Sequence, residues 1–243
     1  MTSSRTPSQS DALRALRDAR VRVVQLSTAS RVADAIRDQV SEGRFRPGSK
    51  LPEEAIGEVL GVSRNTVREA FVELTGDRLL VREPNRGVFV AVPGSAAVVD
   101  IYRARRILEI GAVRGGGSNE LVAAVRRAVD EGMAAGAQGD VVATGTANQH
   151  FHGALVGLAG STRLDRLMRQ MLAEMRLVFH TGNLAQNFHQ GYLDDNEKLC
   201  RLLESGAFDS AADALGPYLD RSEAEVLQAI APVGQEATSS SGP

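Results

Sequence analysis

Apolar residues between positions 28 and 76 recur every three or four residues, which is the spacing of helices that bury one face. The first predicted helix follows a cap at Ser27 or Thr28 and ends at Gly43. A second helix carries Pro52 in its first turn and ends at Gly61. The residues expected to be buried are Val32, Ala33, Ile36 and Val40 in the first helix, and Ile56, Val59 and Leu60 in the second.

A third helix is predicted after Ser63, a good N-cap residue, with its buried stripe at Val67, Ala70, Phe71 and Leu74. The second and third helices are joined by a short turn that contains glycine, which is the helix-turn-helix pattern. Directly afterwards, LLVRE and GVFVAV alternate like two strands joined by PNRG, which predicts a hairpin. Three helices followed by a hairpin form a winged helix-turn-helix.

Beyond this hairpin the apolar spacing is helical throughout, and no segment alternates convincingly as a strand. Glycines separate the helical stretches, as in a bundle of six or seven helices. The predicted helices span about 98–114, 118–135, 141–159, 161–182, 186–205 and 208–231.

The predicted fold is therefore mainly α, with an N-terminal winged helix-turn-helix followed by an all-helical bundle. The first residues are polar and rich in arginine, and the last are poor in apolar residues, so neither end is expected to pack in a core. The predicted divisions are a flexible arm at 1–27, the winged domain at 28–92, a linker at 93–98, the all-helical domain at 99–232 and a disordered tail at 233–243.

Composition excludes several classes of protein. With 43% hydrophobic and 24% charged residues, the chain is not wholly disordered. No apolar run approaches the roughly 18 residues of a membrane helix, and the N-terminus lacks the apolar core of a secretory signal. Cys200 is the single cysteine, which excludes an internal disulfide and a cysteine-based zinc cage. A cytoplasmic protein without a membrane partner is expected.

The formal net charge of −2 is distributed unevenly. Residues 1–92 carry 15 basic and 12 acidic side chains, whereas residues 93–243 carry 13 and 18. Only the first part therefore favours a polyanionic partner. Within residues 31–92 the two signs balance at ten each, so an interface with nucleic acid depends on where particular arginines lie.

The start of the third helix is the best candidate for contact with DNA. The predicted third helix would be the recognition helix of the helix-turn-helix. The N-terminal residues of a recognition helix reach base edges in the major groove, where Arg suits guanine and Asn suits adenine. Isolated arginines would more simply solvate a helix end, but a cap, an apolar stripe, a glycine turn and a wing in register favour DNA. The predicted DNA-binding residues are Arg64, Asn65, Thr66 and Arg68 of the helix, Arg86 and Gly87 of the wing, and Arg46 and Lys50 as phosphate contacts before the second helix.

The segments GRFRPGSKLPEE, LGVSRNTVREA and NRGVFV resemble the N-terminal domain of GntR-family bacterial transcription regulators, over about residues 28–92. The resemblance implies a winged domain that binds operator DNA. One departure is Ala55, where many relatives carry an arginine that touches DNA, so this chain is expected to make one contact fewer.

The segments IYRARRILEIGAVR, NQHFHGALVGLAGSTRLDRLM and DDNEKLCRLLESGAFDSAADALGPYL resemble, in that order, the FCD effector domain of the FadR-like subfamily. The resemblance covers about residues 99–230 and implies a helical bundle that forms a homodimer. Many such domains hold a divalent metal on one aspartate and three histidines. Placed residue by residue, these four positions fall on Asn148, His152, Asn196 and Tyr218.

Neutral amides are poor replacements for imidazole around zinc or nickel. We therefore predict no metal cofactor, and a polar pocket lined by these four residues that binds a small organic effector. Arg105 or Arg106 is expected to pair with a carboxylate or phosphate of that effector.

Two alternatives stay open. The four histidines, His150, His152, His180 and His189, lie within one 40-residue stretch and could build a remodelled metal site, although the first two point to different sides of a helix. The chain could also be a DNA-binding protein that has lost its ligand. An enzyme is not expected, because phosphate loops, nucleophile elbows and metalloprotease helices are missing, and Glu109 alone is more simply a solvated or salt-bridged carboxylate.

The sequence thus predicts a dimeric regulator, preferably a repressor, that binds a short inverted repeat and responds to a small anionic effector.

Overall fold

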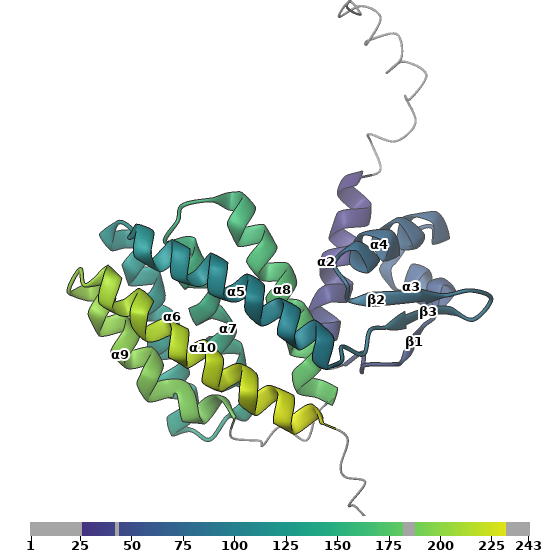
Figure 1. Ribbon diagram of the computed structural model, residues 1–243. Helices are drawn as coiled ribbons and strands as arrows, with labels where there is room; N and C mark the ends of the chain where they lie inside the picture. The colour runs from purple at the N-terminus through teal and green to yellow at the C-terminus, as the bar shows by residue number, and fades with distance from the viewer. Residues whose placement is uncertain (1–25, 42–43, 182–187, 232–243) are drawn as a thin grey trace, which may run out of the picture. The chain divides into compact units, whose positions relative to one another are not determined.

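The structure, a computed structural model, describes residues 26–41, 44–181 and 188–231 (Figure 1). The chain divides into two compact units: one holds the helices and strands up to Val90, and the other holds the residues from Ala91 onward together with Arg46–Gly48. Within the described ranges, no helix combines the length and the apolar character needed to cross a membrane. The predicted arm (except its last residues) and the predicted tail lie outside the described residues, so both stay predictions.

The first unit is the predicted winged helix-turn-helix, with a three-stranded antiparallel sheet in the order β1-β3-β2. The short strand β1 was not expected; it pairs Lys50 with Phe89 and Leu51 with Val88. The elements are α2 (Leu26–Ser41), β1 (Lys50–Leu51), α3 (Glu53–Leu60), α4 (Arg64–Gly76), β2 (Leu80–Glu83) and β3 (Gly87–Val90).

Helix α2 packs on α4 through the predicted apolar stripe, and both stripes are buried. Two polar contacts tie the same helices together: the Ser30 hydroxyl donates to Glu73 at 3.0 Å, and Arg37 donates to Asp77 at 2.7 Å. Because α2 already begins at Leu26, the prediction that Ser27 or Thr28 caps it was wrong.

Helix α3 buries less than the sequence predicted. Val59 is 85% exposed and Leu60 is 40% exposed, so their assignment to the core was wrong. The eight-residue helix turns Gly57 inward, where an added Cβ would lie 3.1 Å from the Val62 carbonyl oxygen and 3.7 Å from Val67. This close approach turns the opposite flank outward, and Val59 and Leu60 line an open apolar groove of about 480 Å³ with residues of α2.

The second unit is helical throughout its described residues. Residues 95–98 were predicted as part of the linker, but helix α5 already begins at Ser95. It can begin there because Ala96 and Ala97 follow Pro93-Gly94 without a helix breaker. The described part of the helix predicted at 186–205 opens with a 3-10 turn. The elements are α5 (Ser95–Gly115), α6 (Asn119–Ala137), α7 (Val141–Gly157), α8 (Thr162–Thr181), η1 (His189–Tyr192), α9 (Leu193–Glu204) and α10 (Phe208–Ile230).

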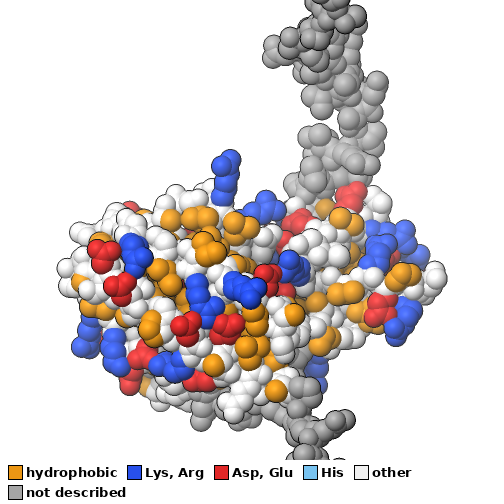
Figure 2. Space-filling model, in the orientation of Figure 1, with side chains coloured by type: hydrophobic (Ala, Val, Ile, Leu, Met, Phe, Trp, Pro, Cys, Tyr) orange, Lys and Arg blue, Asp and Glu red, His pale blue; other side chains and the backbone are white. Residues whose placement is uncertain are grey.

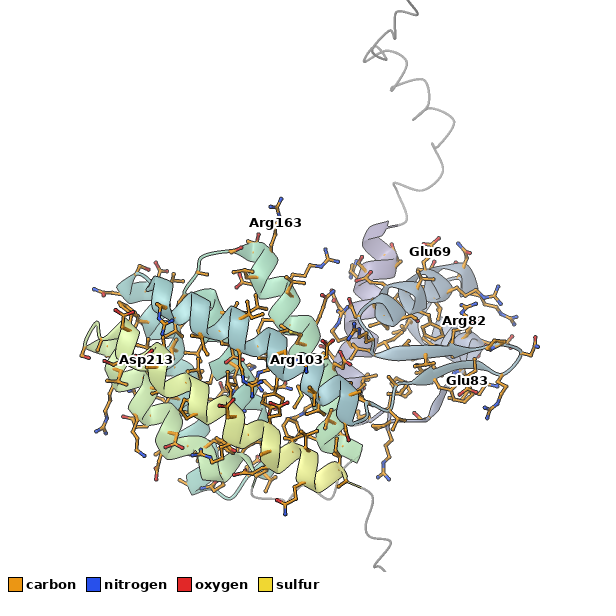
Figure 3. The ribbon with its side chains drawn as sticks, viewed as in Figure 1. Glu69, Arg82, Glu83, Arg103, Arg163 and Asp213 are labelled. Atoms are coloured by element: carbon orange, nitrogen blue, oxygen red, sulfur yellow. The ribbon has the colours of Figure 1, made fainter. Side chains whose placement is uncertain are left out.

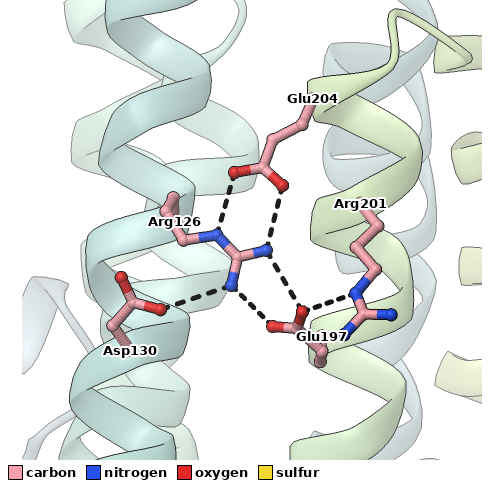
Figure 4. Close-up of polar contacts among 5 residues, drawn as sticks. All are labelled: Arg126, Asp130, Glu197, Arg201 and Glu204. Carbon is pink, nitrogen blue, oxygen red and sulfur yellow. Dashed lines mark hydrogen bonds and ion pairs between the residues drawn. The ribbon is translucent and has the colours of Figure 1, made fainter.

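Polar contacts fasten the outer helices of this bundle to one another. Arg126 of α6 donates to Glu204 at 2.9 Å and to Glu197 at 2.6 Å, both on α9, and Arg201 shares Glu197 at 2.7 Å (Figure 4). Inside, α5 lies along α10, and the Tyr102 hydroxyl shares a 2.6 Å hydrogen bond with Ser222. The bundle therefore surrounds a core that is not purely apolar.

Candidate functional site

The start of α4 is capped and solvent-exposed, as predicted. The Ser63 hydroxyl accepts a hydrogen bond from the Thr66 backbone N–H at 3.1 Å, and the two hydroxyls lie 2.8 Å apart. Because the buried stripe occupies the other face, Arg64, Asn65 and Arg68 are exposed. The structure therefore brings the four helix residues predicted to read DNA together on one accessible surface.

Carboxylates accompany these side chains. Arg64 forms an ion pair with Glu54, and the Arg68 Nε donates to Glu53 at 2.7 Å, so both arginines are tied to the first turn of α3. The Asn65 amide donates to Glu69 at 3.0 Å. The contacts of Glu53 and Glu54 with α4 depend on how the two helices pack, whereas Glu69 lies one turn after Asn65 on α4 itself.

The wing brings three more of the predicted residues together. Gly87 has a φ of 119°, and an added Cβ would lie 2.9 Å from the Lys50 side chain, so glycine is required where β1 meets β3. Arg86 lies over the Phe89 ring at 5.5 Å and pairs with Glu83, which Figure 3 labels along with Glu69. Arg46 is exposed in the turn before β1. On the face drawn in Figure 2, basic side chains of this unit lie beside acidic ones.

The four predicted pocket residues meet inside the helical unit. The Asn148 side-chain oxygen accepts from Asn196 at 3.2 Å and lies 3.5 Å from the Tyr218 hydroxyl oxygen. The same hydroxyl lies 3.3 Å from Nε2 of His152. Helices α7, α9 and α10 therefore contribute to one buried polar cluster.

Helix α5 completes this cluster with Arg105 and Glu109, both buried. Arg105 Nε donates to one oxygen of Glu109 at 2.7 Å, and the other oxygen lies 2.7 Å from Nδ1 of His152. Arg106 is not brought here, since it binds Asp220 at 2.8 Å and Glu223 at 2.5 Å. Of the two alternatives predicted for Glu109, solvated or salt-bridged, the structure shows the salt-bridged one. The signal that identifies it is the spacing of the buried α5 residues, Val98, Ile101, Tyr102, Arg105, Glu109, Ala112 and Val113.

The charges in this cluster fix its protonation. Burial raises the pKa of the Glu109 carboxyl group, but Arg105 and His152 lower it by more, so the net pKa lies below its usual value. Burial, together with the charge of Arg105, lowers the pKa of His152 by more than Glu109 raises it. His152 is therefore neutral near pH 7, with Nδ1 donating to the carboxylate and Nε2 accepting from the Tyr218 hydroxyl.

Three buried polar atoms of this region have no hydrogen-bond partner among the described residues: Nη2 of Arg105, the side-chain oxygen of Asn196 and Nδ1 of His189. They come from α5, α9 and η1. Arg176 adds a second buried guanidinium. Its Nη1 lies 2.7 Å from the position that a Cβ added to Gly145 would take, and Gly145 is one helical turn before Asn148 on α7. Buried polar atoms are normally paired, so these atoms are able to receive a polar ligand.

The histidines do not converge as a metal site requires. His150 is exposed and lies 2.8 Å from Glu131, on a different side of α7 from buried His152, and His180 is exposed near the end of α8. His189 is buried between Phe179 and Phe188, with ring centres at 4.6 and 5.1 Å. Across the part of the chain that the structure describes, no three His, Cys, Asp or Glu side chains are grouped to hold an ion.

We expect the stability of the protein to fall as the pH is lowered from 7 to 5. Burial, followed by the charge of Arg176, lowers the pKa of His189 to about 3, so below about pH 6.5 the unfolded chain binds a proton that the folded chain excludes. Each such histidine contributes up to about 1.4 kcal/mol per pH unit. Urea unfolding of His189→Asn should show a shallower pH dependence, and exposed His150→Asn an unchanged one; equal slopes in all three proteins would refute this.

Comparison with known proteins agrees with this architecture. Residues 28–90 match the family described as bacterial regulatory proteins, gntR family, and residues 100–221 match the FCD domain. The structure of a GntR protein from Rhodococcus sp. RHA1 is 42% identical, with a TM-score of 0.78, over 84% of this chain and 99% of that one.

Two curated relatives are similar over shorter stretches. The Nta operon transcriptional regulator of Aminobacter aminovorans is 30% identical over 144 residues, 55% of this chain and 65% of that protein. The galactonate operon transcriptional repressor of Escherichia coli K12 is 39% identical over 67 residues, 27% of this chain and 29% of that protein. The chain thus covers less than two thirds of the length of either relative.

A winged helix-turn-helix with an exposed, capped third helix, followed by a helical unit with a buried polar cluster, defines a DNA-binding transcription regulator. The chain belongs to the GntR family of bacterial regulatory proteins, and its helical unit is an FCD domain. The predicted family and fold class are confirmed, and the families and named relatives are transcription regulators rather than enzymes.

Proposed function

We propose that the protein is a repressor whose α4 lies in the major groove of an operator, with Arg64, Asn65, Thr66 and Arg68 facing the bases. The exposure of the capped α4 N-terminus supports this placement. The wing would meet the phosphate backbone through Arg86, Gly87 and Lys50, with Arg46 as a further phosphate contact. A relative named as an operon repressor supports repression over activation.

The operator-binding form is a homodimer in this proposal. A two-fold protein presents two copies of α4 and reads two half-sites related by the same symmetry, so its operator is a short inverted repeat. An isolated winged unit makes too few base contacts to select one site in a genome, and a second copy supplies the missing ones.

The helical unit binds the effector at the buried cluster of Arg105, Asn148, His152, Asn196 and Tyr218. The observation that carries this proposal is the set of three unpartnered atoms on Arg105, Asn196 and His189. The two buried guanidinium groups, Arg105 and Arg176, favour an anion such as a carboxylate or phosphate. The Asn196 oxygen requires a donor, so the effector also carries a hydroxyl or amine.

This effector site works without a metal in our proposal, because the donor set does not fit zinc or nickel. The Nε2 lone pair of His152 already accepts from Tyr218, and the amide oxygen of Asn148 accepts from Asn196. A metal-dependent sensor built on remodelled histidines is the alternative, and elemental analysis of protein purified without chelators distinguishes the two.

We expect Asn196→Leu to uncouple the effector from DNA. The substitution removes the acceptor, so about 10- to 100-fold more effector should be needed to release the operator, while DNA affinity without effector stays unchanged. Band shifts with a panel of hydroxy acids, sugar acids and sugar phosphates measure this on a duplex that the protein selects from a random library.

The matched control is Asn119→Leu, an exposed asparagine at the start of α6. It should respond to the effector like the unmodified protein. If the Asn196→Leu variant is released from the operator at the same effector concentration as the unmodified protein, the effector binds elsewhere. Retention of the operator with every compound of the panel would favour the ligand-independent DNA-binding protein.

A further inference from the structure

Four of the side chains that face DNA in the proposed complex are each engaged by a glutamate of the same unit. Arg64 pairs with Glu54, Arg68 with Glu53 at 2.7 Å, Asn65 with Glu69 at 3.0 Å and Arg86 with Glu83. The first two pairs join α4 to α3, across 10 and 15 residues of sequence. The packing of the two helices therefore produces them.

These pairs nearly neutralise the interface. The proposed interface has five cations, Arg46, Lys50, Arg64, Arg68 and Arg86, and the four carboxylates of these pairs. Binding to DNA of any sequence comes mainly from cations that neutralise phosphates and release counterions. An interface with one net positive charge gains little from this effect, and its carboxylates are repelled by phosphates.

The two α3 pairs are well suited to exchange partners. Both arginines are more than half exposed, at 61% for Arg64 and 60% for Arg68, so water already weakens their ion pairs. A guanine offers an arginine two acceptors in fixed geometry, which is a stronger contact than an exposed carboxylate. A phosphate accepts from an arginine in the same two-point manner as the glutamate carboxylate, so exchanging one for the other gains little.

We infer that Glu53 and Glu54 are specificity-determining residues of the DNA interface. They hold Arg68 and Arg64 away from the phosphates of generic duplexes and release them only where a correctly placed guanine replaces the carboxylate. This inference rests on the proposed function, in which α4 reads the operator bases. It explains how residues 31–92 serve as a DNA-binding unit although their formal charges balance.

The test is the double variant Glu53→Gln/Glu54→Gln, with Glu54→Gln alone as a second variant. Both keep the side-chain shape and remove charge. Fluorescence anisotropy measures affinity for a duplex selected by the unmodified protein and for a scrambled duplex, between 50 and 200 mM salt. We expect the double variant to bind the scrambled duplex about tenfold more tightly, with less than a threefold change for the selected one. The salt slope for the scrambled duplex should steepen by about 0.9 per freed arginine.

Glu58→Gln is the matched control, since Glu58 is exposed on the same helix and the structure shows no ion pair for it among the residues described. Equal gains with Glu58→Gln and the double variant would reduce the effect to general charge and overturn the inference. An unchanged affinity of both Glu→Gln variants for the scrambled duplex would also overturn it. If Arg64→Ala leaves both duplexes unaffected, the proposed interface itself fails.

Discussion

Replacing Glu109 by alanine is expected to lower the free energy of unfolding by about 3–5 kcal/mol, the largest effect of any single change considered for this protein. Glu109 is 0% exposed and accepts from both Arg105 and His152. Without it, the guanidinium of Arg105 stays buried without its carboxylate, and the Nδ1 proton of His152 loses its acceptor. Urea unfolding followed by circular dichroism measures the loss.

A matched change is Glu120→Ala, at an exposed carboxylate in the first turn of α6, which should alter stability by less than about 0.5 kcal/mol. The double variant Arg105→Met/Glu109→Leu removes both charges and should recover much of the loss, because well-packed apolar residues often replace a buried ion pair without cost. A loss below about 1 kcal/mol in Glu109→Ala would show that the cluster does not depend on this carboxylate.

The winged unit was predictable from sequence because its signals are local. The cap at Ser63, the stripe of α4 and the alternation of β2 and β3 each lie within a few residues. Strand β1 has only two residues and exists because β3 pairs with it, so no local pattern reveals it. The exposure of Val59 follows from the close approach at Gly57, which is likewise a matter of packing.

The candidate effector site was predictable in part. The resemblance to the FCD domain placed Asn148, His152, Asn196 and Tyr218, and the structure brings these residues together. The sequence left the choice between Arg105 and Arg106 open, although neighbouring positions on a helix point about 100° apart. The two arginines are distinguished only by the buried stripe of α5, which includes Arg105 but not Arg106. Recognising that stripe in the sequence requires accepting charged residues as part of a core.

The contribution of His189 has no local signal either. Its burial depends on the rings of Phe179 and Phe188, which both pack against it. These two residues lie on either side, in the sequence, of a segment outside the described residues. Sequence spacing therefore predicts which face of a helix is buried, whereas the pairing of buried charges is decided by helices that meet from distant parts of the chain.

Arg64→Ala is expected to weaken binding to the selected operator by about 10- to 150-fold, equivalent to about 1–3 kcal/mol, and to relax the preference at the base pair that Arg64 contacts. The loss follows from the removal of a bidentate donor at the exposed start of α4, where the Ser63 cap fixes the backbone. Lys50→Ala is the contrast: it should weaken all duplexes alike and reduce the salt slope by about one. Anisotropy titrations with operators mutated at each position separate the two patterns. If Arg64→Ala weakens binding to all duplexes equally, this arginine contacts a phosphate. If the variant binds as tightly as the unmodified protein, the N-terminal turn of α4 does not lie in the groove.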